Sequence, residues 1–230
     1  MEEPGGIDVI DTQSRENTHH ITTGSRVHNT YVTPDGMYVV AGTFGGEGNL
    51  DVFSTDSWER VFQLYPPTTS NALDGIRPMA FDTHPDGSTK NIYVQISNIH
   101  GFAVVDFNKR IEIGRVILPD VPLEERDPPP YNAAPAHGIG VTPDGETLWV
   151  CSRWNGFVYA YSLPEMAFLG GVKVGSHPDW ITFSPDSKYA YAANGASDDV
   201  SVIDVEKLIE IERIKVGSAP KRNITTVLAR

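Results

Sequence analysis

Short apolar runs separated by polar turns recur along the whole chain. The runs LDVFS (50–54), FAVVD (102–106), VYAYS (158–162) and VSVID (200–204) are rich in Val, Ile, Tyr and Phe, and Gly, Asn, Asp or Pro flank them. Such runs between turn-forming residues predict β-strands. Helical periodicity is weak even in Val205–Ile214, where we expect a strand from near Leu208 because its counterparts in the other repeats are strand-like. The pattern predicts an all-β fold.

Two features repeat with a similar step and define a repeated unit. A turn with the consensus Thr-Pro-Asp-Gly begins at Thr33, His84, Thr142 and Ser184, so the units recur about every 42 to 58 residues. The strand that ends in Asp or Ser, as at Asp106 and Ser162, follows the same spacing. The longest step contains Pro119–Ala134, rich in Pro and acidic residues, which we expect to be a surface loop. Repeats of about this length with four short strands are typical of β-propeller blades.

The last repeat, SPDSKYAYAANGASDDVSVIDVEKLIEIERIKVGSAP, resembles the YVTN-type propeller repeat through its YAYAAN, VSVID and VGSAP segments. The resemblance extends over nearly the whole chain, and proteins of this group are similar to lactonase-like, surface-layer and haem-nitrite-reductase-type propellers. It implies a single β-propeller domain over 1–230. Four complete blades are expected at about 26–67, 75–119, 135–174 and 176–217, with a partial blade from 6–24 and 218–230. A solenoid or sandwich is the alternative fold.

The blade count leaves two arrangements open. The amino end supplies only the third and fourth strands of a blade, and PKRNITTVLA at the carboxyl end supplies only a first strand. One blade built from both termini would close a five-bladed ring and remove its exposed edges. Alternatively the chain is a fragment of a seven-bladed propeller, in which case exposed edges would favour homo-oligomers.

Composition and net charge limit the kinds of partner that the chain is expected to bind. The 230 residues carry a formal charge of −12, which argues against nucleic acid and anionic membranes as partners. No apolar run is long enough to cross a bilayer, and no signal peptide is visible in this sequence. The single cysteine, Cys151, excludes an internal disulfide and is expected to be an inert core thiol.

Candidate chemistry lies just before the first strands. In a propeller this position and the loop between second and third strands share one end, at the mouth of the central channel, opposite the Pro-Asp-Gly turns. Counting back five residues from each turn gives His28, Met79, His137 and Asp179. Counting back seven gives Arg26, Arg77, Pro135 and His177, and aligning VGSAP with VGSHP adds Lys221. The loops between second and third strands add Glu47, His100, Arg153 and Trp154.

Two kinds of function fit these residues. We predict a scaffold that binds a small molecule or a protein at the channel mouth, with Arg26, Arg77, His100, Arg153, Trp154 and Lys221 as ligand-binding residues. The alternative is an enzyme. It would be either an oxidoreductase with copper, iron or zinc on His28, His137 and His177, or a lactonase-like hydrolase with catalytic candidates Arg77, His137 and Asp179. Standard catalytic motifs are absent from the sequence.

The resemblance also implies a bacterial or archaeal origin and an extracytoplasmic location, either periplasmic or secreted. The Asp of each Pro-Asp-Gly turn is expected to be structural.

Overall fold

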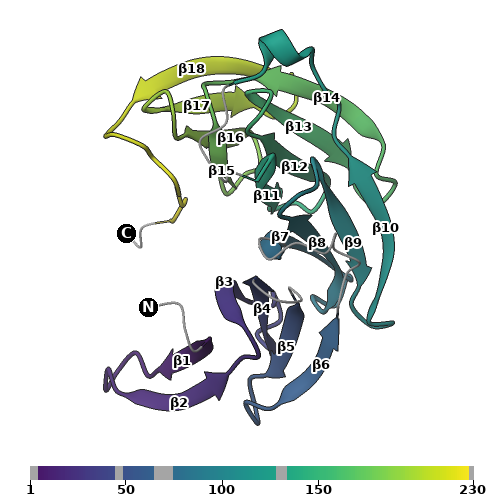
Figure 1. The fold of residues 1–230 in the computed structure, drawn as a ribbon, viewed down its shortest axis with the longest axis vertical. Coiled ribbons are helices and arrows are strands. Elements are labelled where there is room, and N and C mark those ends of the chain that lie inside the picture. The colour runs from purple at the N-terminus through teal and green to yellow at the C-terminus, as the bar shows by residue number, and fades with distance from the viewer. Residues whose placement is uncertain (1–4, 45–48, 65–74, 128–133, 228–230) are drawn as a thin grey trace. The chain divides into compact units, whose positions relative to one another are not determined.

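A computed structural model describes residues 5–44, 49–64, 75–127 and 134–227. It shows four antiparallel four-stranded sheets and one two-stranded sheet, so the all-β propeller fold with an incomplete blade is confirmed (Figure 1). Within each sheet, strands that follow one another in the sequence are hydrogen-bonded neighbours. Among the described residues the helical structure is a single 3₁₀ turn, Leu123–Glu125, and no helix there is long and apolar enough to cross a membrane.

The two-stranded sheet consists of β1 (Gly6–Ile10) and β2 (Asn17–Thr22). The next blade is β3 (Arg26–Val32), β4 (Tyr38–Phe44), β5 (Leu50–Ser54) and β6 (Arg60–Leu64). The following blade is β7 (Ile76–Thr83), β8 (Thr89–Ile96), β9 (Gly101–Asp106) and β10 (Ile111–Ile117). The fourth is β11 (Ala136–Val141), β12 (Thr147–Ser152), β13 (Phe157–Ser162) and β14 (Phe168–Lys173). The last is β15 (Pro178–Phe183), β16 (Tyr189–Asn194), β17 (Asp199–Asp204) and β18 (Ile209–Lys215), which confirms the strand expected from near Leu208.

Two compact units are present in the chain. We call residues 1–98 and 103–115 the N unit, and residues 99–102 and 116–230 the C unit. In the N unit the β1–β2 sheet packs on the β3–β6 blade around buried Ile21, Val39, Ala41 and Phe53. Trp58 packs against this cluster from the turn between β5 and β6.

The core of the C unit lies between the last two blades. Trp149, Cys151 and Val158 on one blade meet Ile181 and Phe183 on the next, and all are at least nine-tenths buried. Burial raises the pKa of the Cys151 thiol, which keeps it protonated and confirms its expected place in the core. The core is therefore apolar on both faces, as packing between two blades requires.

The Pro-Asp-Gly turns are scaffold, as predicted. In the turn at Thr142, Asp144 Oδ1 accepts hydrogen bonds from the Thr142 hydroxyl at 2.6 Å and the Glu146 amide at 3.0 Å. Gly145 has φ of +77°, a left-handed conformation that glycine adopts at little cost. Ser187 takes the glycine position of the last turn with φ of +59°.

The carboxyl-terminal segment corrects one expectation. Residues 218–230 were expected to supply a first strand, yet the described part, up to residue 227, contains no strand after β18 (Figure 1). This segment contacts β15 and β16 through side chains: Asn223 Nδ2 donates to Tyr191 O at 2.9 Å, and Thr225 and Thr182 bond through their hydroxyls at 3.3 Å. Its backbone therefore pairs with no strand edge within the described part of the chain.

Candidate functional site

The residues counted back from the turns fall at irregularities in the first strands. Each first strand shifts register against its second strand near its amino end, and such bulges bend the strand and re-aim a side chain. The shifts lie between Val27 and Asn29, Ile76 and Met79, Ala136 and Ile139, and Pro178 and Trp180. His28, His137 and Asp179 lie within them. Below, the end of each blade that holds these bulges is called the first-strand end.

In the C unit, His137, Arg153 and Asp179 form one contact group at the first-strand end. Arg153 Nε donates to Asp179 Oδ1 at 2.6 Å, and the two side chains form an ion pair. Their side chains are only 10% and 14% exposed, so the pair is largely desolvated. His137 Nδ1 lies 2.8 Å from the main-chain oxygen of Asp179. Because a carbonyl oxygen only accepts, Nδ1 carries the proton, and in the neutral ring the lone pair is on Nε2.

Trp180 extends this group toward the carboxyl-terminal segment. The His137 and Trp180 rings lie 5.8 Å apart, and the Arg222 guanidinium lies 4.8 Å from the centre of the Trp180 ring. A Cβ on Gly195 would lie 2.3 Å from Asp179 Oδ2. Glycine at position 195 is therefore what leaves room for the Asp179 carboxylate.

A second group in the C unit surrounds Trp154, in the loop between β12 and β13. His100 Nε2 lies 2.7 Å from Ser152 Oγ, and the His100 and Trp154 rings are 5.8 Å apart. The Arg126 guanidinium lies 5.1 Å from the Trp154 ring centre and forms an ion pair with Asp120. Burial lowers the pKa of His100, so its neutral form is favoured.

The insertion after β10 is anchored on this second group. Asn155 Nδ2 donates to Pro119 O at 2.9 Å, and the Asp127 amide donates to Trp154 O at 2.7 Å. The Asp127 carboxylate accepts from the His177 amide at 3.1 Å. The described part of the predicted loop therefore runs along the first-strand end and is fixed at both of its ends.

The remaining predicted residues of the C unit lie nearby or in solvent. His177 is 5% exposed and has φ of +53°, and Lys221 is exposed. Pro135 O accepts from the Arg153 amide at 3.0 Å.

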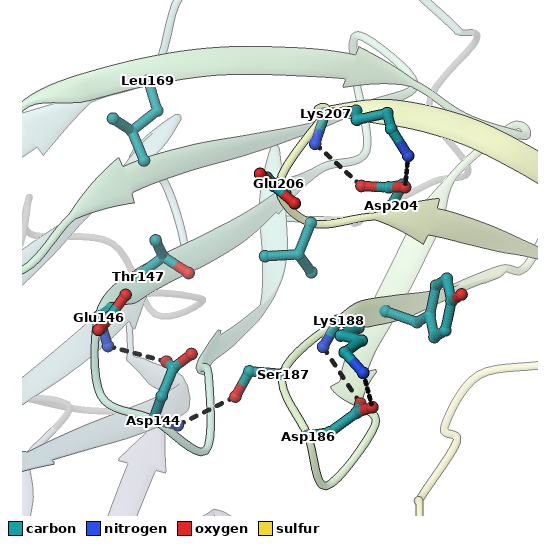
Figure 2. A pocket seen from close by; sticks show the side chains of 12 residues that line it. Asp144, Glu146, Thr147, Leu169, Asp186, Ser187, Lys188, Asp204, Glu206 and Lys207 are labelled. Atoms are coloured by element: carbon teal, nitrogen blue, oxygen red, sulfur yellow. Dashed lines mark hydrogen bonds and ion pairs between the residues drawn. The ribbon is translucent and has the colours of Figure 1, made fainter.

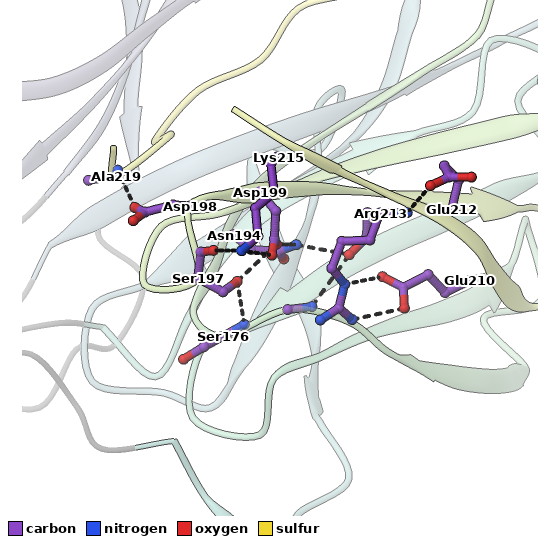
Figure 3. Close-up of polar contacts among 12 residues, drawn as sticks. Ser176, Asn194, Ser197, Asp198, Asp199, Glu210, Glu212, Arg213, Lys215 and Ala219 are labelled. Carbon is purple, nitrogen blue, oxygen red and sulfur yellow. Dashed lines mark hydrogen bonds and ion pairs between the residues drawn. The ribbon is translucent and has the colours of Figure 1, made fainter. Parts of the chain in front are cut away.

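The loop after β16 is ordered by Asp199, whose carboxylate accepts from Asn194 Nδ2, Ser197 Oγ and Lys215 Nζ at 2.9, 2.9 and 3.2 Å (Figure 3).

In the N unit the predicted residues gather around Phe44. The His28 and Phe44 rings lie 5.8 Å apart, and the Arg77 guanidinium lies 5.4 Å from the Phe44 ring centre. Arg77 Nε also donates to Ser97 Oγ at 2.7 Å, and Arg26 pairs with Phe44 in the strand register. Met79 is a core residue, 2% exposed. Glu47 lies outside the described residues.

The positions of the described residues give no support to the predicted metal site. Among them, no three His, Cys, Asp or Glu side chains lie close enough together to hold a metal ion. His28 belongs to the N unit, whereas His137 and His177 belong to the C unit. The copper, iron or zinc set therefore stays a prediction.

Sequence reasoning missed a groove at the opposite end of the C unit, where the Pro-Asp-Gly turns lie. It has a volume of about 560 Å³ (Figure 2). Two lysines, Lys188 and Lys207, pair with Asp186 and Asp204 at 3.2 and 2.6 Å. The acidic residues that line it outnumber these lysines; they are Asp144, Glu146, Asp186, Asp204 and Glu206. The turn end is therefore acidic, and it contrasts with the Arg- and His-rich first-strand end.

Solved structures share this fold at low sequence identity. A functionally unknown protein from Desulfotomaculum acetoxidans DSM 771 matches with a TM-score of 0.71 and 16% identity, over 96% of this chain and 66% of that one. Kuenenia stuttgartiensis hydrazine synthase matches with a TM-score of 0.60 and 18% identity, over 84% and 51%. This chain thus spans less than two thirds of either protein. No curated protein matches its sequence.

A protein family does match the sequence. Residues 6–216 match the family described as "Lactonase, 7-bladed beta-propeller", a span that includes every strand observed. The match agrees with the antiparallel four-stranded blades and with the repeat that predicted them. The chain therefore belongs to the lactonase family of seven-bladed β-propellers.

Proposed function

We propose that this propeller binds a small organic anion at the first-strand end of the C unit. The observation that carries the proposal is the desolvated Arg153–Asp179 pair beside His137. Replacing a buried ion pair by apolar residues is often neutral or stabilising, so stability alone gives little reason to keep one. A fold that keeps one beside an oriented imidazole is better explained by binding.

The charge of the site favours an anionic ligand. Arg153 pairs with the Asp179 carboxylate, and the Arg222 guanidinium lies over the neighbouring Trp180 ring. These two arginines and one aspartate sum to +1 in a chain of −12. Guanidinium groups bind carboxylates in a bidentate geometry. The Trp180 ring beside them offers a flat apolar surface for the body of the ligand.

Thermal-shift and calorimetric titrations with pairs of organic acids and their neutral amides would test this proposal. We expect an acid to bind at least about tenfold more tightly than its amide, and Arg222→Gln to weaken the acid by a similar factor. Lys188→Gln is the matched control, because it removes one positive charge at the turn end of the same unit. Equal effects of the two variants, or equal binding of acid and amide, would contradict an anion site.

Hydrolysis of a lactone is the second candidate. The hydrogen bond from Nδ1 places the His137 lone pair on Nε2, which suits a general base that activates water. The family name points to the same chemistry. A panel of lactones should then be hydrolysed by the wild type and not by His137→Gln. Equal hydrolysis by the wild type and by His137→Gln across the panel would eliminate this candidate.

We also propose an extracytoplasmic location, which the resemblance of the repeats supports. A protein is the other kind of partner that this end of the unit could bind, and the absence of standard catalytic motifs from the sequence supports a binding role.

A further inference from the structure

Two buried hydrogen-bond donors lie next to each other around Trp154. Trp154 Nε1 and Arg126 Nε are both inaccessible to solvent, and neither has a hydrogen-bond partner among the residues that the structure describes. Both groups can only donate. The guanidinium that carries one lies 5.1 Å from the ring that carries the other. A buried donor without an acceptor costs free energy, so two in contact point to an acceptor that the folded chain does not itself supply.

The peptide that carries Arg126 is hydrogen-bonded to the β12–β13 loop at both ends and is exposed at its middle. We call residues 119–127 the strap. Pro119 O and the Asp127 amide bind Asn155 and Trp154, whereas Leu123 at the middle is 76% exposed. The Arg126 side chain is 25% exposed although its Nε is buried. A rotation of Arg126 within the strap would therefore uncover both donors without breaking the anchors.

The charges around the donors favour a neutral acceptor. The Asp120 carboxylate already pairs with Arg126, and the His100 ring lies 5.8 Å from the Trp154 ring. The His100–Ser152 hydrogen bond occupies the His100 Nε2 atom. With His100 in its neutral form, Arg126 and Asp120 cancel each other's charge, so an anion gains little from them. A carbonyl oxygen has two lone pairs and can accept from two donors at once.

We propose that Trp154 Nε1 and Arg126 Nε form a binding site for the carbonyl oxygen of a neutral ligand, beneath the strap. The indole face of Trp154 contacts the apolar body of the ligand, and Arg126 closes over it. This site is distinct from the organic-anion site at Arg153, Asp179 and Arg222, and it does not depend on that site. Asn155 Oδ1, a buried acceptor also without a partner among the described residues, lies on the next residue and suits a ligand with an N–H group beside its carbonyl.

Benzamide and benzoate are suitable probes because they share shape and differ in charge. The four tryptophans, Trp58, Trp149, Trp154 and Trp180, each give one indole N–H signal in a ¹H–¹⁵N correlation spectrum. Benzamide should shift the Trp154 signal downfield and saturably. The Trp149 signal is the internal reference, because its Nε1 already donates to Thr147 Oγ1 at 2.9 Å. Benzoate should need at least about a tenfold higher concentration to shift the Trp154 signal, whatever it does at the organic-anion site.

Two variants test the donors by calorimetry. Trp154→Phe keeps an aromatic ring and deletes the indole N–H donor. Arg126→Lys keeps the positive charge and deletes the guanidinium Nε–H donor. Each should weaken benzamide at least about tenfold, and the spectrum shows whether the variant is folded. Arg222→Gln should leave benzamide unaffected, which separates this site from the organic-anion site. A Trp154 signal that responds to benzoate at a lower concentration than to benzamide, or that does not shift with benzamide, would overturn the proposal.

Discussion

Asp179 contacts Arg153 and His137 through different atoms. Its side-chain Oδ1 accepts from Arg153 Nε at 2.6 Å, and its main-chain oxygen accepts from His137 Nδ1 at 2.8 Å. A change in the carboxylate therefore removes the partner of Arg153 and leaves the acceptor for His137 in the backbone. The two halves of the site can be tested separately by substitution at a single position.

Asp179→Asn should lower the free energy of unfolding by about 3 kcal/mol, because it leaves the largely buried Arg153 charge without a counter-charge. The double variant Arg153→Met/Asp179→Leu should regain much of that loss. Urea denaturation gives both values. Asp56→Asn, in an exposed turn, is the control and should change stability by less than about 0.5 kcal/mol. A loss for Asp179→Asn no larger than for this control would show that the ion pair is not desolvated in solution.

Gly195→Ala should destabilise the protein by about 1–3 kcal/mol, because the added Cβ would lie 2.3 Å from Asp179 Oδ2 and displace the carboxylate from Arg153. Gly217→Ala is the matched control, since a Cβ there meets nothing within 4 Å. Thermal unfolding of both variants gives the comparison. If the two alanine variants melt at the same temperature, the approach of Asp179 to Gly195 is wrong.

The fold could be predicted from the sequence because each blade repeats the same local signals. The sequence of every four-stranded sheet contains the same two signals, a strand that ends in Asp or Ser and a turn with Asp at a fixed position. A strand that is ambiguous in one repeat can therefore be assigned from its counterparts in the others. The carboxyl-terminal segment has no such support. Its Val and Ile residues indicated a strand, but its contacts are made by Arg222, Asn223 and Thr225 side chains.

Counting residues from the turns gives equivalent positions only where the first strand has its usual length. His137 and Asp179 contact each other as the count indicates, but Met79 lies in the core. In β7 a second irregularity between Asp82 and Thr83 breaks the register before the turn and shifts the count. Counting positions within the repeats also cannot predict contacts made by segments that lie outside the repeats. Arg222 on Trp180 and Arg126 on Trp154 were missed for that reason.

Stability should fall as the pH falls below about 6.5, with His100 as one cause. Burial lowers the pKa of His100 in the folded state, so on acidification the unfolded chain binds the proton first. The loss of stability caused by His100 is absent above the pKa of the unfolded chain and grows as the pH falls toward the lower pKa of the folded state. His100→Gln should reduce this acid sensitivity in urea titrations between pH 7 and 5. Ser152→Ala should retain it, because burial and not the hydrogen bond is the main cause. Unchanged acid sensitivity in His100→Gln would contradict the burial of this ring.

The last turn should respond differently to two substitutions at Ser187. Ser187 adopts φ of +59° where the turn at Thr142 has Gly145, and its Oγ accepts from the Asp144 amide at 3.0 Å. Both Ser187→Ala and Ser187→Gly lose that acceptor, worth about 1 kcal/mol. Glycine alone also relieves the left-handed backbone, by a similar amount. We therefore expect the glycine variant to be near wild type and the alanine variant about 1 kcal/mol less stable, as measured by urea denaturation. Gly145→Ala, which introduces the same backbone strain without a hydrogen-bond change, should match the difference between them. If alanine and glycine at 187 were equally stable, the hydrogen bond to Asp144 and not the backbone would determine the stability of this turn.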